Sequence, residues 1–253
     1  MIPYERMLGM KTLKTTGIVI AENSLGDSDK ILTLLTPNVG KITCVAKGAK
    51  RPKSMLLAGS QLLCFGEYVL RRSNDMYTIQ SCDPIEIFYQ IRVDLDKLNY
   101  TATIVKIITD VTTENQNNYY ILKLFLNTLY MISESDKDLD FIMSVFRMRL
   151  LKLLGYGPNV EECVGCGQKD DLVEFSIKDD GFKCDVCSRQ DKSAIKLSEG
   201  SKYALIYSLK ADSKKLFSFK ISDNALREFE LISRIYFNEK LEKEYKVEKL
   251  MGC

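Results

Sequence analysis

Short runs of β-branched and aromatic residues fill the first 85 positions of the chain, and turn residues separate them. Five such runs predict strands at 15–23, 30–36, 40–47, 61–72 and 76–83. Five short strands, with one longer connection between the third and the fourth, predict a small closed Greek-key barrel, of which the OB-fold is the best-known case. A five-stranded barrel of the SH3 kind is the alternative.

From about residue 86 the apolar positions change to helical spacing. Three stripes predict amphipathic helices: Leu95, Leu98, Ala102, Val105 and Ile108; Ile121, Leu124, Phe125, Thr128 and Leu129; and Phe141, Val145, Met148, Leu151 and Leu154. The third helix should end at Gly155-Tyr156-Gly157-Pro158, since Gly and Pro terminate helices. Helical spacing returns at 202–209 and 223–237, and the tail at 240–250 is mostly charged.

Together these patterns predict an α+β protein. We expect an N-terminal five-stranded OB-like β-barrel at residues 1–83, followed by an α-helical domain made of residues 84–160 and 190–253. The segment 161–189 interrupts the helical pattern and reads as an insertion, a zinc ribbon with four cysteines.

The insertion has the form C-x2-C-x17-C-x2-C, with Cys163, Cys166, Cys184 and Cys187. Two residues between thiolates let one turn present both sulfurs to one ion, and two such turns complete a tetrahedral Zn²⁺ shell. The residues between the pairs alternate and contain the turn Asp180-Gly181, as in a β-hairpin. Four thiolates leave no position for water, so we expect one structural zinc per chain and no zinc catalysis.

The composition excludes several classes of catalytic site. The 253 residues are 45% hydrophobic and 28% charged, which is typical of a globular protein, and they include no histidine. Without histidine, Ser-His-Asp and Cys-His catalysis and histidine-based zinc hydrolysis are excluded. We also find no P-loop, no Rossmann glycine pattern and no acidic metal cluster, so the residues give no sign of an ATPase, a dehydrogenase or a nuclease, and none of a small-molecule substrate.

The sequence also indicates a cellular compartment for the protein. No apolar run is long enough to cross a bilayer, the N-terminus lacks the apolar core of a secretory signal, and the cysteine pairs favour a reducing cytoplasm. Met10 could equally be the start, with residues 1–9 as an extension. We interpret three of the remaining cysteines as small hydrophobic core residues: Cys44, Cys64 and Cys82. Nothing in the sequence indicates a role for Cys253.

Positive charge is concentrated in the predicted barrel. Residues 1–80 carry 11 Lys and Arg against 6 Asp and Glu, whereas residues 163–187 carry 3 against 6. The segment VAKGAKRPKS at 45–54 is the densest cluster, and further cations come from neighbouring strands. The set predicted to bind nucleic acid is Lys41, Lys47, Lys50, Arg51, Lys53, Arg71 and Arg72.

On a small barrel these cations could converge on one rim and bind phosphates, with Phe65, Tyr68 and Tyr77 as base-stacking surface. A solvated loop without a partner is the alternative. Asp27 and Asp29 lie close together, but we interpret them as turn residues and not as a catalytic pair. The acidic cysteine segment is not expected to contact phosphate itself.

With these pieces in order, the chain resembles the bacterial recombination mediator family RecO. The resemblance runs from TTGIVIAENSLGDSDKILTLLTPNVGKITCVAKGAKRPKS at 15–54, through FRMRLLKLLGYGPNVEECVGCG at 146–167, to the second cysteine pair. It implies a DNA-binding role without covalent chemistry, in RecF-pathway recombinational repair. Such proteins bind single- and double-stranded DNA, promote annealing, and with RecR help to load RecA on strands coated with single-strand-binding protein.

The resemblance also implies a cytoplasmic, nucleoid-associated protein and a dock for the acidic C-terminal tail of single-strand-binding protein. Candidate residues for that dock are Arg147, Arg149 and Lys152, although Arg149 could instead be an internal capping or ion-pair residue. Two alternatives remain from the residues alone: a zinc-ribbon regulator related to transcription or RNA, and a zinc-ribbon enzyme.

Overall fold

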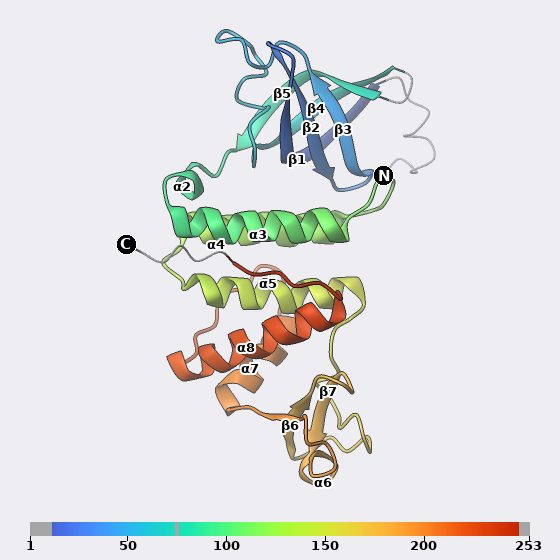
Figure 1. Cartoon of the computed structure of the whole chain (residues 1–253), viewed down its shortest axis with the longest axis vertical. Helices are drawn as coiled ribbons and strands as arrows, with labels where there is room; N and C mark the ends of the chain where they lie inside the picture. The colour runs from blue at the N-terminus through green and yellow to red at the C-terminus, as the bar shows by residue number, and fades with distance from the viewer. Residues whose placement is uncertain (1–11, 74–75, 248–253) are drawn as a thin grey trace. The chain divides into compact units, whose positions relative to one another are not determined.

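The computed structural model describes residues 12–73 and 76–247, which form two compact units (Figure 1). One unit contains the residues up to Ser133, and the other runs from Glu134 to Lys246. Met10 and Cys253 lie outside the described residues. The predicted division into a barrel domain at 1–83, a helical domain at 84–160 and 190–253, and an insertion at 161–189 stays a prediction.

The first unit begins with the predicted five-stranded barrel. Its strands are β1 (Thr12–Leu25), β2 (Asp29–Thr36), β3 (Gly40–Ala46), β4 (Phe65–Ser73) and β5 (Met76–Glu86). They close in the order β1-β2-β3-β5-β4, and every pair is antiparallel except β3 with β5. This order confirms the OB-like barrel over the SH3 alternative.

Alternating side chains of these strands fill the barrel interior, among them Val19, Leu34 and Leu70. Cys44, Cys64 and Cys82 are buried there, as predicted, and burial raises the pKa of the Cys44 thiol to about 12. The prediction that Tyr68 offers a stacking surface is wrong. Its side chain is 1% exposed, and its hydroxyl donates to the Gly59 carbonyl at 2.8 Å, because the strand alternation directs it inward.

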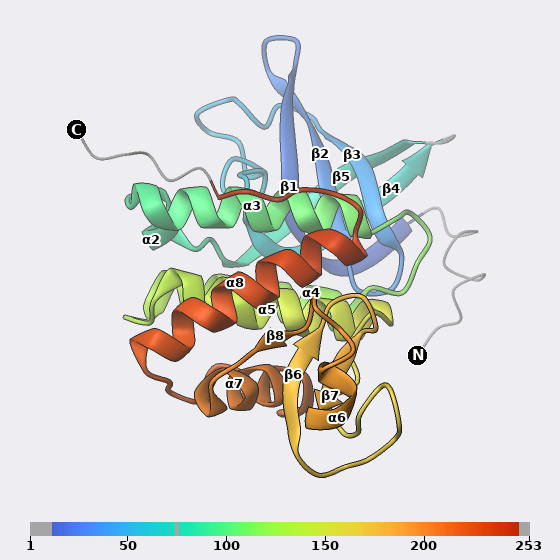
Figure 2. The same cartoon turned by 60° about the horizontal axis from the view of Figure 1, so that its bottom comes forward.

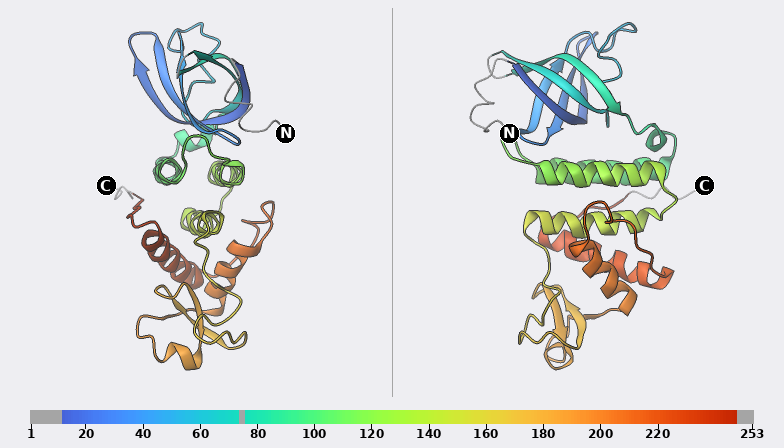
Figure 3. Two further views of the ribbon diagram at one scale, coloured as in Figure 1. Left: turned by 90° about the vertical axis from the view of Figure 1, so that its right-hand side faces the viewer. Right: turned by 180° about the vertical axis from the view of Figure 1, so that it is seen from behind.

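Helices α2 (Tyr89–Arg92), α3 (Leu95–Val111) and α4 (Tyr119–Glu134) complete this unit, with α3 and α4 side by side beneath the barrel (Figure 3). The apolar stripe predicted for α3 is only partly right. Leu95 and Leu98 are exposed, and the buried face carries Tyr100, Ile104 and Ile107 instead. Apolar residues surround most of this helix, so spacing alone could not indicate the side that packs.

The second unit packs α5 (Leu139–Leu154) against α7 (Glu199–Lys210) and α8 (Asp223–Lys240). The predicted stripe of α5 is buried from Phe141 to Leu151, and the helix ends as predicted at Gly155, whose φ of 87° is left-handed. Between α5 and α7 lies a small sheet in the order β7-β6-β8 (Figure 2). Its elements are β6 (Leu172–Ser176), β7 (Gly181–Cys184), α6 (Asp185–Ser188) and β8 (Ile195–Lys196).

The predicted hairpin is formed by β6 and β7, which pair antiparallel from Ser176 and Gly181 onward. The third strand, β8, is two residues long and was not predicted, because so short a segment carries no periodicity. Among the described residues, no helix combines the length and the apolar character that a membrane crossing requires.

Candidate metal centre and cation clusters

Four cysteine sulfurs meet at one end of the small sheet in the second unit. Cys163 and Cys166 come from the loop before β6, Cys184 ends β7, and Cys187 lies in α6. Their Sγ atoms all lie within 4.8 Å of one another. Cys163 and Cys184 are buried, whereas Cys166 is exposed, so the cluster reaches the surface on one side.

The cluster fits a tetrahedral metal shell. Zinc–sulfur bonds of about 2.3 Å place the sulfurs of such a shell about 3.8 Å apart. The Sγ atoms of Cys166 and Cys184 are 3.7 Å apart. Gly165 keeps the first turn tight, since a Cβ at that position would lie 2.9 Å from the Cys187 sulfur. The four residues could therefore hold one tetrahedral ion with a complete protein ligand set.

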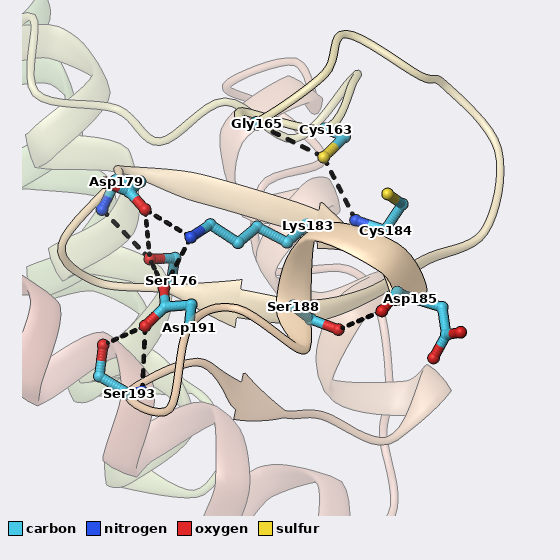
Figure 4. Close-up of polar contacts among 10 residues, drawn as sticks. All are labelled: Cys163, Gly165, Ser176, Asp179, Lys183, Cys184, Asp185, Ser188, Asp191 and Ser193. Atoms are coloured by element: carbon cyan, nitrogen blue, oxygen red, sulfur yellow. Dashed lines mark hydrogen bonds and ion pairs between the residues drawn. The ribbon is translucent and has the colours of Figure 1, made fainter.

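Backbone amides prepare one of these thiols for ionisation. Burial alone would raise the pKa of Cys163, but the N–H groups of Cys184 (3.3 Å) and Gly165 (3.4 Å) donate to its sulfur and lower the pKa to about 6. A thiolate is the form that binds metal. The turn therefore stabilises the ligand form of Cys163 (Figure 4).

A buried ion-pair network crosses the same hairpin (Figure 4). The Lys183 ammonium lies 2.5 Å from Asp179 and 2.8 Å from Asp191, and the Ser176 hydroxyl donates to Asp191 at 2.6 Å. The Lys183 ammonium and the hydroxyls of Ser176 and Ser193 hold the pKa of Asp191 well below its usual range. Our sequence reasoning missed this network, and no sequence signal links Lys183 to Asp191. It joins the hairpin to the segment before β8, away from the thiolates.

The basic segment after β3 is a chain of ordered turns beside the β1–β2 hairpin. Lys47, Arg51 and Lys53 are exposed, and the Lys50 ammonium donates to the Gly26 carbonyl at 2.8 Å. Asp29 holds the segment in place, because its carboxylate accepts the Gly48 N–H at 2.7 Å. That hydrogen bond, the Ser28 hydroxyl and the nearby cations lower the pKa of Asp29. Asp27 lies in the turn, as interpreted, whereas Asp29 is the first residue of β2 and positions the basic segment.

Six of the seven predicted cations form two groups and not one rim, and Arg71 belongs to neither group. Lys41 starts β3 and the basic segment follows its end, so the two groups are separated by roughly 20 Å along the strand. Arg72 joins Lys41 in lining one cavity, whereas Arg71 alternates to the opposite side of β4 and is exposed. The Arg72 guanidinium lies 5.8 Å from the centroid of the half-buried Tyr77 ring. The remaining stacking candidate, Phe65, is also half-buried.

The three cations suggested for partner binding have partners inside the second unit. Arg147 is 2% exposed and lies 3.6 Å from Glu230. Arg149 donates to the Ala211 carbonyl and Lys152 to the Leu209 carbonyl, at the C-terminal end of α7. Cations stabilise carbonyls at helix ends, so the internal capping role foreseen for Arg149 is present. A role of these residues in binding another protein stays a prediction.

Two family models together match nearly the whole chain. "Recombination protein O N terminal" matches residues 10–88, and "Recombination protein O C terminal" matches residues 92–249. A DNA repair protein RecO of Acetivibrio thermocellus is 48% identical over 237 residues, covering 93% of this chain and 94% of the relative. Relatives of the same name from Alkaliphilus metalliredigens (33% identical; 83% and 86% covered) and Caldicellulosiruptor bescii (31%; 94% and 97%) are also similar.

Proposed function

The chain belongs to the RecO family of DNA repair proteins, and from this premise we propose that it is a DNA-binding recombination mediator without catalytic activity. In this role it binds single- and double-stranded DNA and promotes annealing of complementary strands. With RecR it helps to load RecA on single strands coated with single-strand-binding protein, whose C-terminal tail it contacts. It works in the cytoplasm, with the nucleoid.

The basic segment of the barrel is the observation that carries this proposal. Lys47, Arg51 and Lys53 are exposed within seven residues, and the turns from Gly48 to Ser60 hold their backbone in a defined shape. Each phosphate that such a cation neutralises releases counterions and adds affinity that depends on salt. Ordered cations also lose less conformational entropy on binding than cations on a free coil.

We further propose that the four-cysteine cluster holds Zn²⁺ and is structural. The four sulfurs would fill the tetrahedral shell and leave no site for water or substrate. Residues 163–187 carry six acidic side chains against three basic ones, so phosphate binding is assigned to the barrel instead.

Removal of three charges tests the DNA-binding surface. In a variant with Lys50→Gln, Arg51→Gln and Lys53→Gln, single-strand affinity at moderate salt should fall at least tenfold. The slope of log affinity against log salt should become shallower by about 2, since each phosphate contact contributes about 0.7 for single strands. Fluorescence anisotropy with a labelled strand, titrated at several salt concentrations, measures both quantities.

The matched control removes three exposed lysines of the second unit, with Lys192→Gln, Lys196→Gln and Lys214→Gln. It has the same net charge as the test variant but keeps the basic segment. If both variants lose affinity equally, net charge and not the basic segment determines binding. Unchanged affinity in the test variant would remove the basic segment from the DNA-binding surface.

A further inference from the structure

A cavity of about 380 Å³ opens in the first unit at the start of β3, about one strand length from the basic segment. Its walls come from three places in the sequence: Lys41 and Thr43 on β3, Arg72 and Tyr77 at the β4–β5 hairpin, and the connection from α3 to α4. Val39 and Ile42, which are buried in the barrel core, also border it. This volume is within the range of small-ligand pockets.

The cavity lies beside the seam of the barrel. Among the described residues, β3 and β5 pair only at Cys44 with Tyr77 and Val45 with Thr78. The α3–α4 connection lies along the first residues of β3 (Figures 1 and 2). The Lys41 N–H donates to the Thr113 carbonyl at 3.1 Å, and Gly40 forms a bridge with Glu114.

The wall formed by this connection is held tightly against β3. Gly40 has a φ of 77°, and a Cβ there would lie 2.3 Å from the Thr113 carbonyl oxygen. The Asn115 N–H donates to the Val39 carbonyl at 2.9 Å. Glu114 and Asn115 therefore present a carboxylate and an amide from a backbone that is fixed before any ligand arrives.

The remaining lining of the cavity combines an aromatic ring with two cations. The Tyr77 ring is half-buried and lies beneath the Arg72 guanidinium, and planar groups of this kind stack on nucleobases. The Lys41 ammonium donates to the Thr109 carbonyl at 2.7 Å, which positions it while two of its three protons stay available to an anion. The cavity thus offers separate contacts for the face of a base, for the edge of that base and for a phosphate.

We propose that this cavity is a subsite for one unstacked nucleotide of a DNA single strand. Tyr77 and Arg72 stack on the base, Lys41 contacts its phosphate, and Glu114 accepts a hydrogen bond from an exocyclic amino group. Cytosine offers that amino group where thymine offers a carbonyl oxygen, which a carboxylate repels. The subsite therefore favours cytosine over thymine. This inference rests on the proposed DNA binding and adds to it a preference for base type.

Competition between oligo(dC) and oligo(dT) strands of equal length tests the subsite in the full chain. The unmodified protein should bind oligo(dC) about fivefold more tightly, the effect of one good base-edge contact. Glu114→Gln should bring the ratio close to one, because an amide can donate to the thymine oxygen as well as accept from cytosine. Tyr77→Leu should weaken binding of both strands about fivefold or more, through lost stacking.

Glu67→Gln is the matched control, since Glu67 is an exposed carboxylate of β4 outside the cavity; it should leave the ratio unchanged. A ratio of one in the unmodified protein, or an unchanged ratio in Glu114→Gln, would overturn the subsite. If Tyr77→Leu fails to fold in a thermal melt, the Glu114→Gln ratio decides alone.

The basic-segment variant separates this inference from the proposed function. It should bind both strands more weakly while keeping the preference for oligo(dC). Salt-dependent binding without any base preference would reject only the subsite. No binding of either strand would reject both.

Discussion

Asp29 is a single carboxylate that determines the conformation of the basic segment. It lies at the start of β2, and its side chain accepts both the Gly48 N–H and the Ser28 hydroxyl. It is also close enough to Lys47 and Arg51 for their charges to lower its pKa. An acidic residue here reduces the positive potential of the surface, while its hydrogen bond to the Gly48 N–H orders the segment that carries the cations.

Two substitutions of Asp29 separate charge from anchoring. Asp29→Ala and Asp29→Asn both remove the charge, but only Asn keeps an oxygen that can accept the Gly48 N–H. We expect the Ala variant to bind single strands more weakly than the Asn variant, on the order of fivefold, the effect of one ordinary hydrogen bond. Anisotropy titrations at one salt concentration measure the ratio. Equal affinities would show that the hydrogen bond does not organise the binding surface.

At the scale of elements, the helices of the second unit cap one another. The cations Arg149 and Lys152 of α5 bind carbonyls at the C-terminal end of α7. At the N-terminal end of α7, the Glu228 carboxylate of α8 accepts the Ser198 N–H at 2.8 Å and the Ser201 hydroxyl at 2.7 Å. A helix dipole favours a negative charge at the N-terminal end and positive charges at the C-terminal end, as found here. Helix α7 is thus fixed at each end by a charge from a different helix.

The Glu228 contact makes a testable contribution to pH-dependent stability. Hydrogen bonds from Ser198 and Ser201 lower the pKa of Glu228. A group with a lowered folded-state pKa stabilises the fold above its unfolded pKa, about 4.3 for Glu, and this contribution is lost as pH falls through the folded value. Glu228→Gln should lower the melting temperature by about 2–4 °C near pH 7, the shift for about 1 kcal/mol.

The difference in melting temperature between the two proteins should shrink as pH falls below about 4, because protonation removes the same charge from the unmodified protein. Glu239→Gln, at an exposed position near the end of the same helix, is the control and should change little. A difference that stays constant from pH 7 to acid would mean that the carboxylate charge does not stabilise α7.

At the scale of the molecule, the chain divides its chemistry between two units. The barrel unit carries the cation clusters and the nucleotide-sized cavity, and the second unit carries the four thiols. Within the second unit the ribbon is part of the helical core: the Phe175 ring of β6 lies 5.4 Å from the Tyr236 ring of α8, and Lys240 pairs with Asp180. Metal in the ribbon should therefore stabilise the helices beside it.

Removal of the metal should destabilise the second unit and spare the barrel. Structural zinc sites contribute on the order of 10 kcal/mol to folding. Chelation, or Cys166→Ser, should therefore lower the melting temperature by roughly 10 °C or more, while single-strand binding by the barrel stays within about twofold below that temperature. Zinc content by mass spectrometry should be one ion per chain and should fall in Cys166→Ser but not in the barrel variant Cys44→Ala.

Loss of DNA binding at a temperature where the helical signal in circular dichroism is intact would show that the ribbon contacts DNA directly. It would then contradict the assignment of binding to the barrel. Retention of stability after complete removal of the metal would contradict the structural role.

The sequence by itself determined the features that depend on residues near one another in the chain. Five strands, the main helices, the Gly155 terminator and the cysteine spacing all follow from period, turn chemistry and ligand distance, which are local properties. Tertiary structure alone decided which face of α3 is buried, that Tyr68 points inward, and that Lys41 and Arg72 line a cavity apart from Lys50. These outcomes depend on strand register, on barrel closure and on the loop that packs beside Gly40, and each of them joins residues that no spacing in the sequence connects.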